Sequence, residues 1–181
     1  MVVEFLAPGF EEAEAVIPVD VLRRAGQTVL TVGLSGKEVT GSHGITLTAD
    51  EAADGFVLPK SAELVMLPGG MPGTRNLNAS EIVAKTLMEA DRRGIFLGAI
   101  CAAPLVLGNK GLLQGHKATI FPGMEDELPT GVFTPEPLVE SGRIITGRAG
   151  GVAFEYALLL VEKLMGRDRA QEIKETLHPI W

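Results

Sequence analysis

Residues 95–104 read Ile-Phe-Leu-Gly-Ala-Ile-Cys-Ala-Ala-Pro, an apolar run that passes through a cysteine into alanines and a proline. Continuous apolarity without alternation indicates a strand that is buried on both faces, inside a parallel sheet. Pro104 suits the first turn of a helix, where the amide donor that it lacks is not needed. The stretch therefore predicts a buried strand, a sharp turn at Cys101 and a helix over 103–113.

The rest of the chain alternates apolar, strand-like runs with segments of helical period. The expected strands are residues 2–6, 28–33 and 64–67, and the expected helices are residues 11–25, 80–93, 152–165 and 168–177. Residues 39–48 predict a short hairpin, and residues 117–145 predict turns and small strands. This alternation is typical of an α/β fold, a mostly parallel sheet with helices on both faces. We expect a single domain over residues 1–181.

Composition excludes several classes of partner. The 23 acidic and 16 basic residues give a net charge of -7, which has the wrong sign for binding a phosphate backbone, and basic pairs such as Arg23-Arg24 are isolated. The start of the chain lacks the features of a signal peptide, and no run of about 18 apolar residues follows. We expect a cytoplasmic protein with no nucleic-acid partner and no membrane association.

Cys101 is the only cysteine, so it cannot form an internal disulfide. A sharp turn that projects its central side chain needs small residues two positions before and after, and Ala99 and Ala103 meet this condition. A helix start favours the thiolate and lowers a thiol pKa of about 8.5. The alternative is an inert, buried cysteine. We expect a nucleophile elbow with a reactive thiol.

Ligands of open parallel sheets bind beyond the carboxyl ends of the strands, so the loops after other strands should surround Cys101. After the first strand, Glu11 and Glu12 are explained as ordinary helix-start charges, whereas Glu14 is placed to face inward toward the thiol. After the strand at residues 64–67, Gly69 and Gly70 have no side chains, so their backbone amides could approach a ligand or an oxyanion. The alternative is that these two glycines form a plain turn.

The three histidines are His43, His116 and His178. None adjoins Cys101 in the sequence, and none has a metal-ligand spacing, so we expect no metal ion. His116 and His178 are expected to be structural or solvated, while the role of His43 is left open.

Four motifs, in order along the chain, closely resemble the ThiJ/PfpI superfamily, in the DJ-one/ThiJ-like branch that includes a human parkinsonism-associated protein and bacterial relatives. These motifs are residues 11–20 (EEAEAVIPVD), 67–70 (LPGG), 99–104 (AICAAP) and 148–151 (RAGG). The resemblance covers essentially the whole chain. It implies a flavodoxin-like three-layer sandwich, homodimeric and without a cofactor.

The resemblance also implies roles for individual residues. Cys101 matches the family's reactive, oxidation-prone cysteine, and Glu14 matches the carboxylic acid that hydrogen-bonds it. The resemblance places the amide-lined pocket at Gly69 and Gly70, and we expect Ala102 in the same pocket. Arg24 matches a position that lies near the partner subunit's site.

The leading hypothesis is a stress-response enzyme that uses Cys101 on reactive carbonyls such as methylglyoxal, of glyoxalase III or deglycase type, with a small aldehyde or glycated substrate. The alternative is a non-catalytic sensor of oxidative stress, or a stress chaperone, that acts through oxidation of Cys101. A cysteine peptidase comes third, because Ala102 stands where the peptidase branch has histidine. Phe121 likewise stands where the human relative has a histidine.

Overall fold

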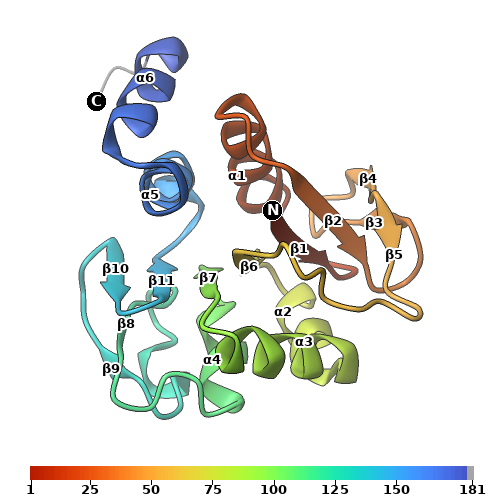
Figure 1. Cartoon of the computed structure of the whole chain (residues 1–181). Coiled ribbons are helices and arrows are strands. Elements are labelled where there is room, and N and C mark those ends of the chain that lie inside the picture. Colours follow the sequence, from red (N-terminus) through yellow and green to blue (C-terminus); the bar gives the residue numbers. More distant parts are fainter. Residues whose placement is uncertain (179–181) are drawn as a thin grey trace.

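The structure, a computed structural model, describes residues 1–178 and is built on a seven-stranded sheet of order β10-β11-β7-β6-β1-β2-β5 (Figure 1). Its strands are β1 (Val2–Leu6), β2 (Val29–Gly33), β5 (Glu51–Ala52), β6 (Leu64–Leu67), β7 (Phe96–Ile100), β10 (Leu138–Ser141) and β11 (Ile144–Gly147). Neighbouring strands are parallel, except for the antiparallel pair β10–β11 at one edge. β7 lies inside the sheet, between β6 and β11, as its continuous apolarity predicts.

Helices cover both faces of this sheet. They are α1 (Glu12–Arg24), α2 (Gly73–Ala79), α3 (Glu81–Arg92), α4 (Pro104–Asn109), α5 (Ala153–Met165) and α6 (Arg167–Leu177). Figure 1 shows α1 and α5 on one side of the sheet and α2, α3 and α4 on the other. α1 packs against α5, which in turn packs against α6. The three layers confirm the predicted flavodoxin-like α/β fold.

Shorter elements lie outside the central sheet. β3 (Glu38–Thr40) and β4 (Thr46–Thr48) form an antiparallel hairpin, as predicted for residues 39–48. β8 (Lys117–Ala118) and β9 (Val132–Phe133) form a small parallel pair. Two single turns of 3-10 helix, Glu125–Glu127 and Gly150–Val152, complete the loops.

α1 shows how local sequence sets the ends of a helix. Glu11 is its N-cap, and a carboxylate oxygen of Glu11 accepts from the amide of Glu14 at 2.7 Å. Arg23 and Arg24 occupy the last turn, where cations are favoured. The helix runs unbroken past Pro18, at the cost of one backbone hydrogen bond, because proline lacks the amide donor.

One predicted helix needs correction, and one helix was not predicted. The helix expected over 103–113 is the much shorter α4, because the chain turns at Gly111, which has a left-handed φ of 74°. α2 carries no sequence signal, since it begins after Pro72 without a side-chain cap. It lies directly beyond the glycines that follow β6.

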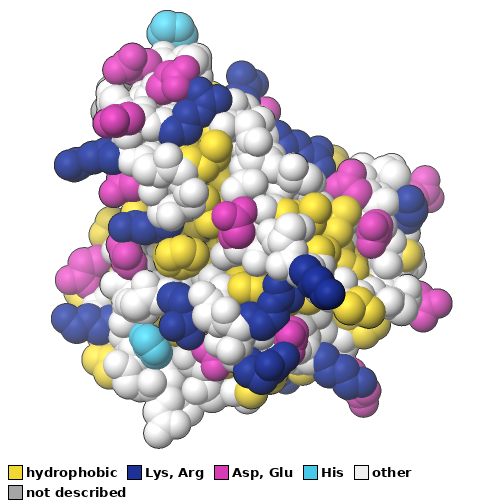
Figure 2. Space-filling view, in the orientation of Figure 1, with side chains coloured by type: hydrophobic (Ala, Val, Ile, Leu, Met, Phe, Trp, Pro, Cys, Tyr) yellow, Lys and Arg dark blue, Asp and Glu magenta, His cyan; other side chains and the backbone are white. Residues whose placement is uncertain are grey.

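The core has one layer on each face of the sheet. Side chains of β1 alternate between them: Val3 and Phe5 join the layer under α3 and α4, and Val2 joins the layer under α1 and α5. Figure 2 shows acidic and basic side chains interspersed over the face in view. Within residues 1–178, no helix is long and apolar enough to span a bilayer.

Candidate active site

Cys101 directly follows β7 and has a left-handed backbone, with a φ of 62°. A non-glycine residue rarely adopts this conformation, so its surroundings must hold it there. Its amide donates to the carbonyl oxygen of Gly147 at 2.9 Å, and its carbonyl oxygen accepts from the amide of Phe121 at 2.8 Å. The thiol therefore projects from a sharp strand-to-helix turn, which is the geometry of a nucleophile elbow.

The elbow is closely packed by small residues. Ala99 and Ala103, two positions before and after the cysteine, are both fully buried. A Cβ atom at Gly69 would lie 2.6 Å from the Cβ of Cys101 and 2.6 Å from a carboxylate oxygen of Glu14. The absence of a side chain at Gly69 is therefore what allows Glu14 and Cys101 to approach each other.

Glu14 reaches this site from the first turn of α1 and is only 2% exposed. Its carboxyl group hydrogen-bonds the thiol of Cys101, and its Oε2 accepts from the amide of Gly69 at 3.0 Å. The amide of Gly150 also donates to it. In the sequence Gly150 stands out only as part of the glycine pair that follows the strand now seen as β11, and its contact with Glu14 was not predicted.

Burial raises the pKa of Glu14 to about 7. The hydrogen bond from Cys101 lowers this pKa, while the negative charge of Glu11 raises it further. Close to neutral pH, a substantial fraction of Glu14 is therefore protonated and able to donate to sulfur.

Burial also raises the pKa of the Cys101 thiol, to about 12, and two further causes add to this effect: the charge of Glu14 and the hydrogen bond that the thiol donates to its carboxylate. Amides of Gly70 and Ala102 act in the opposite direction, because they donate to sulfur and favour the thiolate. The predicted lowering of the thiol pKa by a helix start is wrong: α4 has only six residues, and burial beside a carboxylate dominates.

Cys101 and Glu14 are best treated as one pair that loses a proton near pH 7 and another near pH 12. Between these values the pair holds a single proton, which lies on sulfur, while Glu14 is ionised. Transfer of this proton to Glu14 across the hydrogen bond makes the sulfur a thiolate and Glu14 a proton donor. This arrangement can add a thiolate to an electrophile and protonate the product.

A cavity of about 390 Å³ opens beside the cysteine. It is lined by Gly70, Met71, Cys101, Ala102, Phe121, Pro122, Gly123 and Met124. Two predicted pocket residues, Gly70 and Ala102, are among them, whereas Gly69 lies against Glu14 and Cys101 instead. Neither methionine carried a sequence signal. The lining is predominantly apolar, so a compound that enters buries apolar surface beside the sulfur.

Arg24 is not among the residues that line this cavity. Its Nε donates to Oδ2 of Asp20 at 2.7 Å, in the exposed last turn of α1. The expected position of Arg24 near a partner subunit's site stays a prediction.

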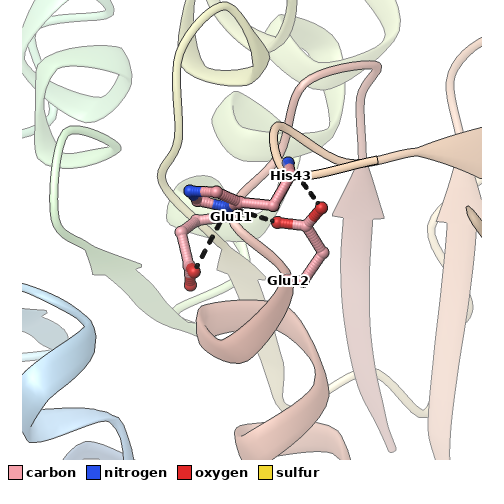
Figure 3. Close-up of side chains that lie close together, drawn as sticks. All are labelled: Glu11, Glu12 and His43. Atoms are coloured by element: carbon pink, nitrogen blue, oxygen red, sulfur yellow. Dashed lines mark hydrogen bonds and ion pairs between the residues drawn. The ribbon is translucent and has the colours of Figure 1, made fainter. Parts of the chain in front are cut away.

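Glu12, two residues before Glu14, points toward His43 in the turn of the β3–β4 hairpin (Figure 3). Its Oε1 accepts from the amide of His43 at 2.7 Å, and its Oε2 lies 2.9 Å from Nδ1 of the same histidine. Burial alone would raise the pKa of Glu12, but these contacts with His43 and the amide of Ile45 lower it to about 2. The open question of His43 thus has a structural answer, since Glu12 holds the hairpin turn onto α1.

Together with Glu11, this pair offers three potential metal-ligand atoms within 4.8 Å of one another, the one such group among the described residues. His43 Nδ1 lies 4.0 Å from Oε1 of Glu11 and is already paired with Glu12. The expectation of no metal ion stays a prediction.

The other two histidines are remote from the sulfur. Nδ1 of His116 lies 3.2 Å from Oγ of Ser141, between the β8 region and β10, and His178 is exposed after α6. None of the three histidines lines the cavity beside Cys101.

Comparisons with known proteins agree with this geometry. The model of the DJ-1/PfpI family matches residues 1–163. Parkinson disease protein 7 homolog of Danio rerio is 38% identical over 176 residues, covering 95% of this chain and 93% of the relative. Glutathione-independent glyoxalase DJR-1.2 of Caenorhabditis elegans is 32% identical over 169 residues, covering 92% and 89%.

The crystal structure of Drosophila melanogaster DJ-1beta superposes with a TM-score of 0.94 at 34% identity, covering 99% of this chain and 98% of that one. The family match, these relatives and this shared fold extend over nearly the whole sequence. The chain therefore belongs to the DJ-1/PfpI family.

Proposed function

We propose that this protein is a cofactor-independent stress-response enzyme that uses Cys101 on small reactive carbonyls, of glyoxalase or deglycase type. The observation that carries the proposal is the buried Glu14 carboxyl group, hydrogen-bonded to a thiol that projects from an elbow beside a cavity. The relative named as a glutathione-independent glyoxalase supports the same chemistry.

In the first step, the thiolate sulfur of Cys101 forms a bond to the aldehyde carbon of a 2-oxoaldehyde, and the carbonyl electron pair moves onto oxygen. Glu14 supplies the proton that this oxygen takes up, which gives a hemithioacetal. The amides of Gly70 and Ala102, which donate to sulfur before the reaction, are available to polarise the carbonyl oxygen.

In the second step, ionised Glu14 removes the proton from the carbon that is bound to sulfur, and the ketone oxygen takes up a proton to give an enediol. Return of a proton to the former ketone carbon gives a 2-hydroxy thioester. Water then adds to the thioester and the thiolate leaves, so methylglyoxal yields lactate and glyoxal yields glycolate. One carbon is oxidised by two electrons and the other is reduced by two, so no external oxidant, reductant or cofactor is required.

A glycated amine or thiol can reach the same pathway once its bound aldehyde is transferred to Cys101. The apolar lining of the cavity, which includes Met71 and Phe121, favours small carbonyl compounds with little charge. A deglycase reaction therefore uses the same residues with a different leaving group.

A second candidate is a redox sensor, and the contacts around sulfur favour it. Each peroxide molecule transfers one oxygen to the sulfur and leaves as water, so two equivalents give a sulfinate. Protonated Glu14 and the amides of Gly70 and Ala102 would hold the sulfinate oxygens. Mass spectrometry after mild peroxide tests the idea, and failure to add two oxygens at Cys101 would count against it. A peptidase is not favoured, because no histidine lines the cavity.

The family resemblance also implies a homodimer, with Arg24 near the partner's site, and we propose this assembly. Light scattering of the purified protein should give twice the 19.1 kDa mass of the chain. A monomeric mass would remove the proposed role of Arg24.

The deciding experiment measures conversion of methylglyoxal to lactate without glutathione. We expect Cys101→Ser to reduce the rate to that of buffer, and Glu14→Gln to reduce it about 100-fold, because a proton-transfer group is lost. Glu12→Gln is the matched control, since it makes the same change two residues away on the hairpin side of α1, and it should retain turnover.

A free thiol at the same concentration is the chemical control. Turnover retained in Cys101→Ser, or a native rate no higher than that of the free thiol, would overturn the enzyme and leave the redox sensor as the better account.

A further inference from the structure

Glu4 is a second buried carboxyl group, and the proposed function does not use it. It lies in β1, paired in register with Thr31 of β2 and Met66 of β6, and is 1% exposed. Its Oε2 has no hydrogen-bond partner among residues 1–178. Its neighbours on the same face of the strand, Val2 and Leu6, are apolar, so the packing of the sheet does not explain a carboxyl group here.

This residue lines a cavity of about 210 Å³ between α1, the first two strands and the β4 region. The cavity is lined by Glu4, Leu6, Ala15, Val16, Val19, Arg23, Thr31, Leu47, Thr48 and Asp50. None of these residues lines the cavity beside Cys101, so the two are separate spaces.

The other two charged groups around this cavity, Arg23 and Asp50, already form an ion pair with each other. Oδ2 of Asp50 accepts from Nη2 of Arg23 at 2.8 Å and from the amide and hydroxyl of Thr31 at 2.9 and 2.8 Å. Nη2 of Arg23 also donates to the carbonyl oxygen of Val29 at 2.9 Å. The Arg23–Asp50 pair is close to neutral, so the charge left uncompensated when Glu4 ionises is negative.

Burial raises the pKa of Glu4 well above its ordinary value, and the positive charge of Arg23 only partly offsets this. The carboxyl group therefore stays neutral while nothing pairs with it. A cation that enters the cavity would favour the carboxylate and give Oε2 the partner that the fold does not provide.

We propose that this cavity binds a small organic cation, a primary ammonium or amidinium group on a compact apolar body, with Glu4 as its counterion. The side chains of Leu6, Val19 and Leu47 supply the apolar surface against which the body packs. An anion would meet the carboxyl groups of Glu4 and Asp50, and would have to displace the contacts that already occupy Arg23.

The test titrates the full chain with benzylamine and benzamidine by calorimetry, and uses benzyl alcohol and benzoate as neutral and anionic controls of similar size. We expect saturable binding of both cations at one site per chain, at least 10-fold tighter than that of either control. Glu4→Gln keeps the shape of the neutral acid and removes its charge, so cation binding should weaken at least 10-fold.

Two further variants keep the test decisive. Ala15→Leu fills the same cavity from α1 and should weaken binding to a similar degree, whereas Cys101→Ser, outside the cavity, should bind as the native chain does. The proposal is overturned if neither cation saturates, if benzoate binds as tightly, if Glu4→Gln binds as the native chain does, or if Cys101→Ser abolishes binding. Thermal unfolding of each variant verifies that it is folded.

Discussion

Glu12 and Glu14 lie two residues apart in the first turn of α1, and both side chains are buried, yet their pKa values shift in opposite directions. The pKa of Glu12 is lowered to about 2, and that of Glu14 is raised to about 7. Helix position and helix dipole are almost the same for both. The difference must come from what each carboxyl group meets across the loop that it faces.

The hairpin side of α1 offers Glu12 several donors. Two backbone amides and a histidine ring contact its carboxylate, and all of them favour the charged form. The elbow side surrounds Glu14 with buried protein and places Glu11 nearby, so the neutral form is favoured in spite of its hydrogen bonds. Two glutamates on one helical turn thus have different roles: Glu12 holds the hairpin, and Glu14 is a candidate proton donor.

Each of these contacts depends on a glycine opposite the carboxyl group. A Cβ atom at Gly69 would collide with Glu14 and Cys101, and one at Gly41 would overlap the carboxylate of Glu12. Both carboxyl groups are therefore accommodated by a glycine that leaves room for them, and they differ in the polar groups that lie nearby.

The largest expected effect is on Glu14. A carboxyl group whose pKa is raised in the folded state contributes stability that is complete below pH 4.5 and is lost as pH rises to about 7. The free energy of unfolding of the native chain should therefore fall, relative to Glu14→Gln, by up to about 3 kcal/mol across this window. Urea unfolding of both proteins at several pH values measures the difference, and parallel pH curves would contradict the raised pKa.

Glu12 should behave with the opposite sign and a smaller amplitude. Its lowered pKa means that it contributes stability above pH 4.5 and loses it as pH falls toward 2. Because its histidine partner is exposed and screened by solvent, we expect the native chain to lose only about 1 kcal/mol relative to Glu12→Gln in this range. Acid unfolding followed by circular dichroism checks this, and a greater loss in the variant would reverse the assignment.

The smallest effect is expected at His43, whose side chain is 71% exposed. The hydrogen bond and the charge of Glu12 raise the pKa of this histidine above 6.5. Its contribution to stability is therefore present below pH 6.5 and is lost as pH rises through the folded value. An NMR titration should place the native His43 above 6.5 and should move it back in Glu12→Gln. An unchanged titration in the variant would show that the pair does not form in solution.

Several features of the fold could be predicted because their causes are local. The apolar run of β1, the acidic start and basic end of α1, and Ser80 as the N-cap of α3 all act within one or two turns of chain. α2 could not be predicted from such signals, because it starts without a side-chain cap. The early end of α4 does have a local signal, Gly111, which the prediction of a helix over 103–113 passed over.

The sequence by itself determined the α/β class, the elbow pattern around Cys101 and the family resemblance, because these depend on residue spacing along the chain. Only the tertiary structure decided that the amide of Gly150 donates to Glu14, that Glu12 holds the hairpin, and that Glu4 lines a separate cavity. The physical reason is that burial and partner geometry set the charge and reactivity of a carboxyl or thiol group, and its partners come from distant strands and loops.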